Sequence, residues 1–195
     1  MTGHQTYLVD ADPQDAGSAQ WWLGRSPGHE NLTIGKHTDL ETLSRLREVE
    51  GFEYVVVDTP PRPDSEQLTA ICHASDLVIV MTGIGPLPLS AAVQTVTSLV
   101  EPTGAPHACL VSMIDARRQG EALEARDQLR EAGIPALEVL ARHYVVLERC
   151  ASDGTLPAEV KGDNANQVLD DIQAMSDEVA ELLARPRKRK RSTNM

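Results

Sequence analysis

The sequence predicts an α/β protein with a doubly wound, mostly parallel sheet and helices on its faces. Short runs rich in Val, Ile and Leu alternate along the chain with longer runs of helical periodicity. The short runs are continuously apolar, as expected for strands that are buried on both faces. The 195 residues are 41% hydrophobic, which is enough for a domain with its own core. We expect one domain at residues 1–184 and a disordered basic tail at residues 185–195.

The predicted strands are short and end at polar or turn-forming residues. They cover residues 6–10, 53–58, 76–82, 107–113 and 134–140. Because helical segments separate them, successive strands are expected to run parallel through right-handed crossovers. Residues 24–37 contain three glycines and are predicted to form a surface loop.

The helical segments begin and end with residues that are typical of helix termini. The first of them starts at Asp39, and Asp64 is the expected N-cap of the second, with Gln67 three residues later completing a capping-box pattern. Pro88 suits a first helical turn, and Gly133 suits the position after a C-terminus. The helices are predicted over residues 39–49, 64–74, 88–101 and 119–132.

A last long helix is predicted over residues 164–184. Apolar residues recur there every three or four positions, at Val168, Ile172, Met175, Val179 and Leu182. Such a stripe fits a coiled-coil seam or a face that packs against the domain's own sheet, and we favour the second.

Composition limits the location and the redox chemistry of the chain. No apolar run approaches the roughly 20 residues of a membrane helix, and no signal-peptide pattern is visible, so we expect a cytoplasmic protein with no membrane partner. The three cysteines, Cys72, Cys109 and Cys150, are isolated. They are expected to be buried or incidental thiols of a reducing compartment.

Two predicted strands end in carboxylates. The first ends at Asp10 and is followed by Asp12 and Pro13, and the second ends at Asp58. A carboxylate at the end of a buried strand is costly to bury without a partner. Carboxylates in this position typically hold Mg²⁺ beside the phosphates of a nucleotide. Residues two apart on a strand point the same way, so Asp10 and Asp12 can face one site. The alternative is structural, with these side chains closing turns or capping the next helix.

The order of these motifs resembles the ParA/MinD family of partition ATPases. Leu-Val-Asp-Ala-Asp-Pro-Gln at residues 8–14 and Tyr-Val-Val-Val-Asp-Thr-Pro-Pro at residues 54–61 carry the resemblance. Residues 74–80 are similar to the family's Ala-Asp-x-Val-Ile-x-Pro strand, and residues 86–92 to its next helix start. The likeness extends over residues 1–183, which implies a P-loop NTPase-like fold.

The resemblance implies ATP and Mg²⁺ as cofactors. By position, Asp12 matches the residue that orients the hydrolytic water, and Asp58 matches the aspartate near Mg²⁺, bound through water. Asp10 and Thr59 are expected to support cofactor binding. Family members form ATP-dependent homodimers, bind DNA non-specifically and respond to a ParB-like adaptor protein. The implied function is plasmid or chromosome partitioning. A non-catalytic interaction protein and an ATPase that positions an organelle or protein complex are the alternatives.

The sequence departs from the family in its phosphate-binding part. The family's first strand, its Lys-Gly-Gly-x-Gly-Lys-Thr loop and its first helix have no match in these 195 residues. We expect them upstream of Met1, where they need on the order of 30 residues, so that the chain as given is truncated or inactive. Ser112 and Met113 replace the family's Asn-Arg pair, and Pro88 replaces an Asp.

The basic tail contrasts with an acidic body. The net charge of the chain is −11, with 18 basic and 29 acidic residues. Basic residues of this kind bind DNA phosphates without reading sequence, so we expect nucleoid association; the alternative is a solvated terminus without a partner. The predicted DNA-binding residues are Arg185, Arg187, Lys188, Arg189, Lys190 and Arg191.

Overall fold

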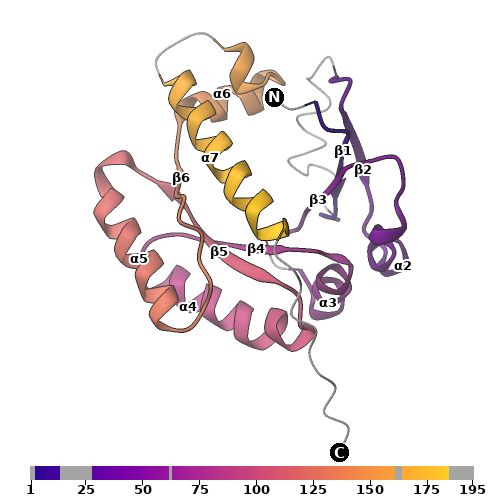
Figure 1. The fold of residues 1–195 in the computed structure, drawn as a ribbon, viewed down its shortest axis with the longest axis horizontal. Coiled ribbons are helices and arrows are strands. Elements are labelled where there is room, and N and C mark those ends of the chain that lie inside the picture. The colour runs from indigo at the N-terminus through magenta and orange to yellow at the C-terminus, as the bar shows by residue number, and fades with distance from the viewer. Residues whose placement is uncertain (1–2, 14–27, 62, 161–163, 185–195) are drawn as a thin grey trace, which may run out of the picture.

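The computed structural model describes residues 3–13, 28–61, 63–160 and 164–184. It confirms the α/β class, with parallel strands and flanking helices (Figure 1). The predicted DNA-binding tail and part of the predicted loop at 24–37 lie outside the described residues.

Six described strands form two parallel sheets of three strands each. The orders are β2-β1-β3 and β4-β5-β6. In the first sheet β1 is central, and it pairs in parallel register with both neighbours. In the second sheet β5 is central. The strands are β1 Thr6–Asp10, β2 Leu32–Lys36, β3 Tyr54–Asp58, β4 Val78–Thr82, β5 His107–Ile114 and β6 Ala141–Arg142.

The helices begin where the sequence signals place caps. Asp64 accepts a hydrogen bond from the Gln67 N–H at 2.7 Å, so the predicted N-cap of α3 is confirmed. Asp39, predicted as the first residue of its helix, is the N-cap of α2 and accepts a hydrogen bond from the Thr42 N–H at 2.8 Å. The helices are α2 Leu40–Ser44, α3 Ser65–Ala74, α4 Pro86–Thr95, α5 Gln119–Glu131, α6 Val145–Asp153 and α7 Ala165–Ala184. A π-helical segment, Val96–Val100, follows α4, and short 3₁₀ turns occur at Leu46–Glu48, Glu101–Thr103, Ala116–Arg118 and Pro157–Glu159.

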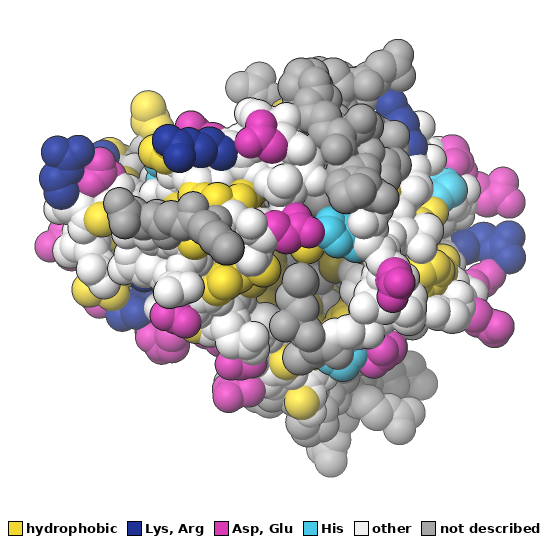
Figure 2. Space-filling model, turned by 90° about the horizontal axis from the view of Figure 1, so that it is seen from above, with side chains coloured by type: hydrophobic (Ala, Val, Ile, Leu, Met, Phe, Trp, Pro, Cys, Tyr) yellow, Lys and Arg dark blue, Asp and Glu magenta, His cyan; other side chains and the backbone are white. Residues whose placement is uncertain are grey.

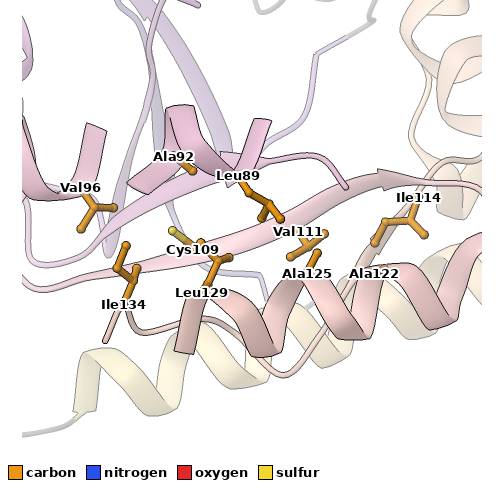
Figure 3. Packing of buried hydrophobic residues seen from close by; sticks show 10 residues of the cluster. All are labelled: Leu89, Ala92, Val96, Cys109, Val111, Ile114, Ala122, Ala125, Leu129 and Ile134. Carbon is orange, nitrogen blue, oxygen red and sulfur yellow. The ribbon is translucent and has the colours of Figure 1, made fainter. Parts of the chain in front are cut away.

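The largest core cluster lies between α4, β5 and α5. Figure 3 shows Val111 of β5 between Leu89 of α4 and Ala125 of α5. Burying a side chain of this size contributes roughly 1.5–3 kcal/mol. The buried members of this cluster are Leu89, Ala92, Val96, Cys109, Val111, Ile114, Ala122, Ala125, Leu129 and Ile134.

Helix α3 packs against both sheets. Its residues Ile71 and Ala74 belong to the cluster formed with β1, β3 and α2. Its residues Leu68 and Cys72 pack instead with Val100 and with the apolar side chains of β4. One helix therefore forms part of the hydrophobic core on either side of the boundary between the sheets.

Helix α7 covers the opposite face of the second sheet. Its Met175 and Leu182 pack against Ala108, Leu110 and Leu137. Ala108 and Leu110 alternate along β5 with residues that face α4 and α5, and successive strand side chains point to opposite faces. The apolar stripe of α7 thus packs on the domain's own sheet, as predicted.

Two predictions of strand and loop are wrong. The segment 134–140 is not a strand: it makes an isolated bridge between Ala136 and Cys109, and the last strand follows at β6. Pro135 lacks the N–H that a continuous ladder needs. Conversely, β2 lies within the predicted loop at 24–37.

Helix boundaries also differ from the prediction. The helix expected at 39–49 ends at Ser44 and is followed by a 3₁₀ turn. The helix expected at 88–101 begins two residues earlier, at Pro86, and becomes π-helical after Thr95. Helix α6 was not predicted. The three cysteines are free and buried, as expected.

Candidate functional site

Asp10 and Asp58 lie side by side at the carboxyl ends of two parallel strands. They are register partners in the pairing of β1 with β3, so both side chains leave the same face of the sheet. Asp10 is fully buried. Its Oδ1 accepts the backbone N–H of Asp12 at 3.1 Å, and its Oδ2 has no hydrogen-bond partner among the described residues.

The segment that holds Asp12 is fixed by backbone hydrogen bonds. The Ala11 N–H donates to the Asp58 carbonyl at 2.9 Å, and the His37 N–H donates to the Asp10 carbonyl at 2.9 Å. Asp12 itself is half-buried. The structure therefore brings Asp10, Asp12 and Asp58 to one edge of the first sheet, and Thr59 follows as an exposed residue.

Gln67 is a further residue of this edge, which the sequence prediction assigned only to a capping box. Its side-chain amide donates to the Ala11 carbonyl at 3.1 Å instead of reaching back to the helix N-terminus. The Gln67 side chain is buried, and the other buried residues of α3 are all hydrophobic. A polar residue on an apolar helix face was the signal that could have identified it.

These residues fit a magnesium site that is shared with nucleotide phosphates, but not one formed by protein side chains alone. No described group of three or more His, Cys, Asp or Glu residues could hold a metal ion by itself. Mg²⁺ in nucleotide sites needs less, since one or two carboxylates share it with phosphate oxygens and water. Asp10, with its unpartnered Oδ2, and the adjacent Asp58 fit that smaller requirement.

The turn between β4 and α4 does not provide a substitute phosphate loop. Gly85 has φ 109° and precedes Pro86, the first residue of α4. Pro86 and Pro88 have no backbone N–H, so the first turn of α4 offers few donors to a phosphate. This agrees with the expectation that the family's Lys-containing loop has no match in these 195 residues.

A second polar cluster, at the end of β6, serves packing. The Arg142 Nε donates to Asp171 Oδ2 of α7 at 2.7 Å, and the Tyr144 hydroxyl donates to the same oxygen at 2.7 Å. Hydrogen bonding from Arg142 lowers the pKa of Asp171. Burial, followed by the bond to Asp171, raises the pKa of Tyr144 to about 12. The cluster ties α7 to the sheet.

The fold is similar to that of solved cell-division ATPases. The MinD cell division protein of Aquifex aeolicus superposes with a TM-score of 0.65 over 90% of this chain and 86% of that chain, at 13% identity. The MinC:MinD complex of the same organism gives 0.62 over 97% and 88%, at 15% identity. MinD of Pyrococcus furiosus gives 0.60 over 90% and 86%, at 13% identity. At these identities the likeness concerns the fold.

A sequence relative decides the family. The chain is 41% identical over 172 residues to the maintenance of carboxysome distribution protein A of Gloeobacter kilaueensis, which covers 88% of this chain and 79% of the relative. The chain belongs to the ParA/MinD-like family of this protein. No protein-family profile matches the chain.

Membership of the ParA/MinD-like family confirms the resemblance and the fold expected from the sequence. In the part of this ParA/MinD-like chain that the structure describes, no helix combines the length and the apolar character of a membrane span. Acidic side chains are spread over the face shown in Figure 2, and hydrophobic ones reach the surface near its middle.

Proposed function

We propose that this chain belongs to an ATP-dependent positioning protein that distributes a protein organelle of the carboxysome kind, and that its use of ATP requires a phosphate-binding loop that these 195 residues do not contain. The juxtaposition of Asp10 with Asp58 at the carboxyl edge of β1 and β3 supports nucleotide chemistry. The relationship to a carboxysome distribution protein supports this cargo. Because of this relationship, we propose the organelle-positioning alternative and not plasmid or chromosome partitioning, the first function that the family resemblance implied.

In this proposal each carboxylate has a separate role. Asp58, through water, and Asp10 would hold Mg²⁺ beside the phosphates of ATP, and Thr59 would contribute to cofactor binding. Asp12 orients the water that attacks the γ-phosphate. Bound Mg-ATP would supply a cleavable phosphoanhydride bond, and the metal would neutralise charge on the phosphate oxygens. The backbone bonds around Ala11 keep Asp12 at this edge, and Gln67 connects that edge to α3.

The proposed partners follow from the same assignment. A ParB-like adaptor protein on the cargo stimulates hydrolysis, and the chain acts as a homodimer on nucleoid DNA in the cytoplasm. The basic residues at 185–191 supply salt-dependent contacts to DNA phosphates.

The test is to substitute Asp12→Ala in the native gene and to image carboxysomes in living cells. We expect evenly spaced carboxysomes to cluster, whereas Asp127→Ala, at an exposed acid on α5, leaves their spacing unchanged. Unchanged spacing together with increased plasmid loss would instead support partitioning. If deleting the gene disturbs the spacing but Asp12→Ala and Asp58→Ala do not, the chain is a non-catalytic interaction protein.

A further inference from the structure

The peptide that joins Ala11 to Asp12 is held at both of its polar ends by side chains. Its carbonyl oxygen accepts a hydrogen bond from the side-chain amide of Gln67 at 3.1 Å. Its N–H, which belongs to Asp12, donates to Oδ1 of Asp10 at 3.1 Å. Because a peptide unit is planar, two bonds at opposite ends fix the orientation of the whole unit.

The preceding peptide, between Asp10 and Ala11, is held in a different way. Its carbonyl accepts the His37 N–H and its N–H donates to the Asp58 carbonyl, both at 2.9 Å. These are main-chain bonds to the ends of the neighbouring strands, and every residue except proline can form them. At the next peptide, in contrast, the geometry depends on the side chains of Gln67 and Asp10.

The burial of Gln67 is explained by this contact better than by the packing of α3. Gln67 is 6% exposed, and burying an amide is unfavourable unless it is hydrogen-bonded. A hydrophobic side chain at this position, like Leu68 and Ile71 on the same helix, would be buried without that requirement. The Ala11 carbonyl is the partner that makes a buried amide acceptable here.

Asp12 has little conformational freedom once the peptide before it is fixed. Pro13 follows Asp12, and a residue that precedes proline is restricted to extended conformations. The Cα–Cβ direction of Asp12 therefore depends on the Ala11–Asp12 peptide. The same peptide occupies Oδ1 of Asp10, so that Oδ2, which has no hydrogen-bond partner among the described residues, is the oxygen left for a cation.

We propose that Gln67 is a positioning residue for both Asp12 and Asp10. Its buried amide fixes the Ala11–Asp12 peptide, which sets the direction of Asp12 and keeps one oxygen of Asp10 occupied. The two bonds run in series from the amide through the peptide to the carboxylate, and buried hydrogen bonds in series strengthen one another. The consequence for ATP hydrolysis rests on the proposed function, whereas the effect on the peptide does not.

Amide hydrogen exchange in the 195-residue chain without nucleotide, followed by NMR, tests the effect on the peptide. Gln67→Met keeps a similar volume but cannot donate to the Ala11 carbonyl. We expect exchange of the Asp12 amide to accelerate on the order of 10-fold. The Ala11 and His37 amides keep their main-chain bonds and should change by less than about 2-fold. An unchanged Asp12 amide, or equal acceleration of all three amides, would overturn the proposal.

Two further variants separate the contact from the general stability of α3. Gln67→Asn carries the same amide on a side chain that is one methylene shorter, and it should give the same selective acceleration even if Gln67→Met disturbs folding. Ile71→Val shortens another buried side chain of α3 and is the matched control. It should leave the Asp12 amide unchanged relative to the Ala11 amide. Selective acceleration at Asp12 in this control would assign the effect to helix packing and would overturn the proposal.

The consequence for catalysis is measured with the protein expressed from the native gene. Gln67→Met should lower kcat for ATP hydrolysis on the order of 10–100-fold and change KM for Mg-ATP by less than about 3-fold. The reason is that Asp12 is proposed to act on the attacking water and not on nucleotide binding. An unchanged kcat would overturn the positioning role. If the wild-type protein hydrolyses no ATP, the proposed function fails, and the exchange experiment still decides whether Gln67 fixes the peptide.

Discussion

Asp10 of β1 lies directly opposite Asp58 of β3, and one oxygen of the buried Asp10 carboxylate has no hydrogen-bond partner among the described residues. A buried carboxylate with an unsatisfied oxygen destabilises a folded chain. Functional sites commonly carry such a destabilising feature, because activity can need a strained or destabilised arrangement.

Replacing Asp10 should therefore stabilise the chain. We expect Asp10→Asn to raise the free energy of unfolding by about 1–2 kcal/mol at neutral pH, because the amide keeps an acceptor for the Asp12 N–H and removes the charge. Urea denaturation measures this change. Asp127→Asn, on the exposed surface of α5, is the control and should change stability by less than about 0.5 kcal/mol. A loss of stability in Asp10→Asn would mean that the carboxylate has a stabilising partner.

Nucleotide binding by the 195-residue chain should be negligible. The backbone N–H groups and the lysine of a P-loop provide most phosphate affinity, and no such motif occurs in this sequence. Isothermal titration with Mg-ATP should show no binding in the micromolar range. Micromolar affinity that disappears in Asp58→Ala would refute this expectation and would show that the carboxylate edge binds nucleotide by itself.

The cluster around Asp171 should make stability depend on acid pH. Arg142 lowers the pKa of Asp171 below its ordinary value of 3.8. A lowered folded-state pKa contributes stability above the unfolded-state pKa, and this contribution is lost as the pH falls through the folded-state pKa. Asp171→Asn should cost about 1–3 kcal/mol at pH 7 and progressively less as the pH falls below about 4. Urea denaturation midpoints of the two proteins from pH 2 to 7 test this. If Asp171→Asn lowered stability by the same amount at every pH, stability would not depend on the titration of Asp171.

Removing the basic tail should weaken DNA binding in a salt-dependent way. Deletion of residues 185–195 removes six basic residues, and each phosphate contact contributes about 0.9 to the slope of log K against log salt. The slope should fall by up to about 5. A full-length chain with Gln at these six positions tests charge at constant length and should behave like the deletion. DNA binding that is equal in all three proteins would remove the tail from the proposed function.

Gly35 on β2 should be hard to replace because of Tyr7 on β1. A Cβ at Gly35 would lie 2.1 Å from the Tyr7 hydroxyl oxygen, which also bonds His37 at 2.6 Å. Gly35→Ala should cost about 1–3 kcal/mol, and Tyr7→Phe in the same chain should recover part of that cost. Gly120→Ala, in α5 with open space around it, should instead stabilise by about 0.5–1 kcal/mol. Additive effects of the Gly35 and Tyr7 substitutions would contradict the proposed clash.

The fold was predictable where local signals agree with tertiary packing. The apolar runs that became β1, β3, β4 and β5 and the Asp64 cap of α3 were identified from the sequence alone. β2 was missed because its Gly35 suggests a loop, whereas the glycine is needed for the approach of Tyr7. The strand expected at 134–140 failed because apolar content does not reveal that Pro135 limits its pairing to one bridge.

The candidate site was predictable in its residue types and only partly in its arrangement. The sequence placed Asp10, Asp12 and Asp58 at strand ends, and the parallel register brings them to the same edge. The contact from Gln67 to the Ala11 carbonyl joins residues 56 positions apart in the sequence. No periodicity encodes such a contact, since it depends on how α3 packs on the sheet.

The packing of α3 on both sheets has a consequence for assembly. All strands of the first sheet come from residues 6–58, and all strands of the second from residues 78–142. Each sheet can consequently form from one uninterrupted stretch of chain, and α3 is the element through which the two halves recognise each other. A chain cut within residues 59–61 would leave α3 with the second half. Its Ile71 and Ala74 would then form an apolar surface to which the first half can bind again.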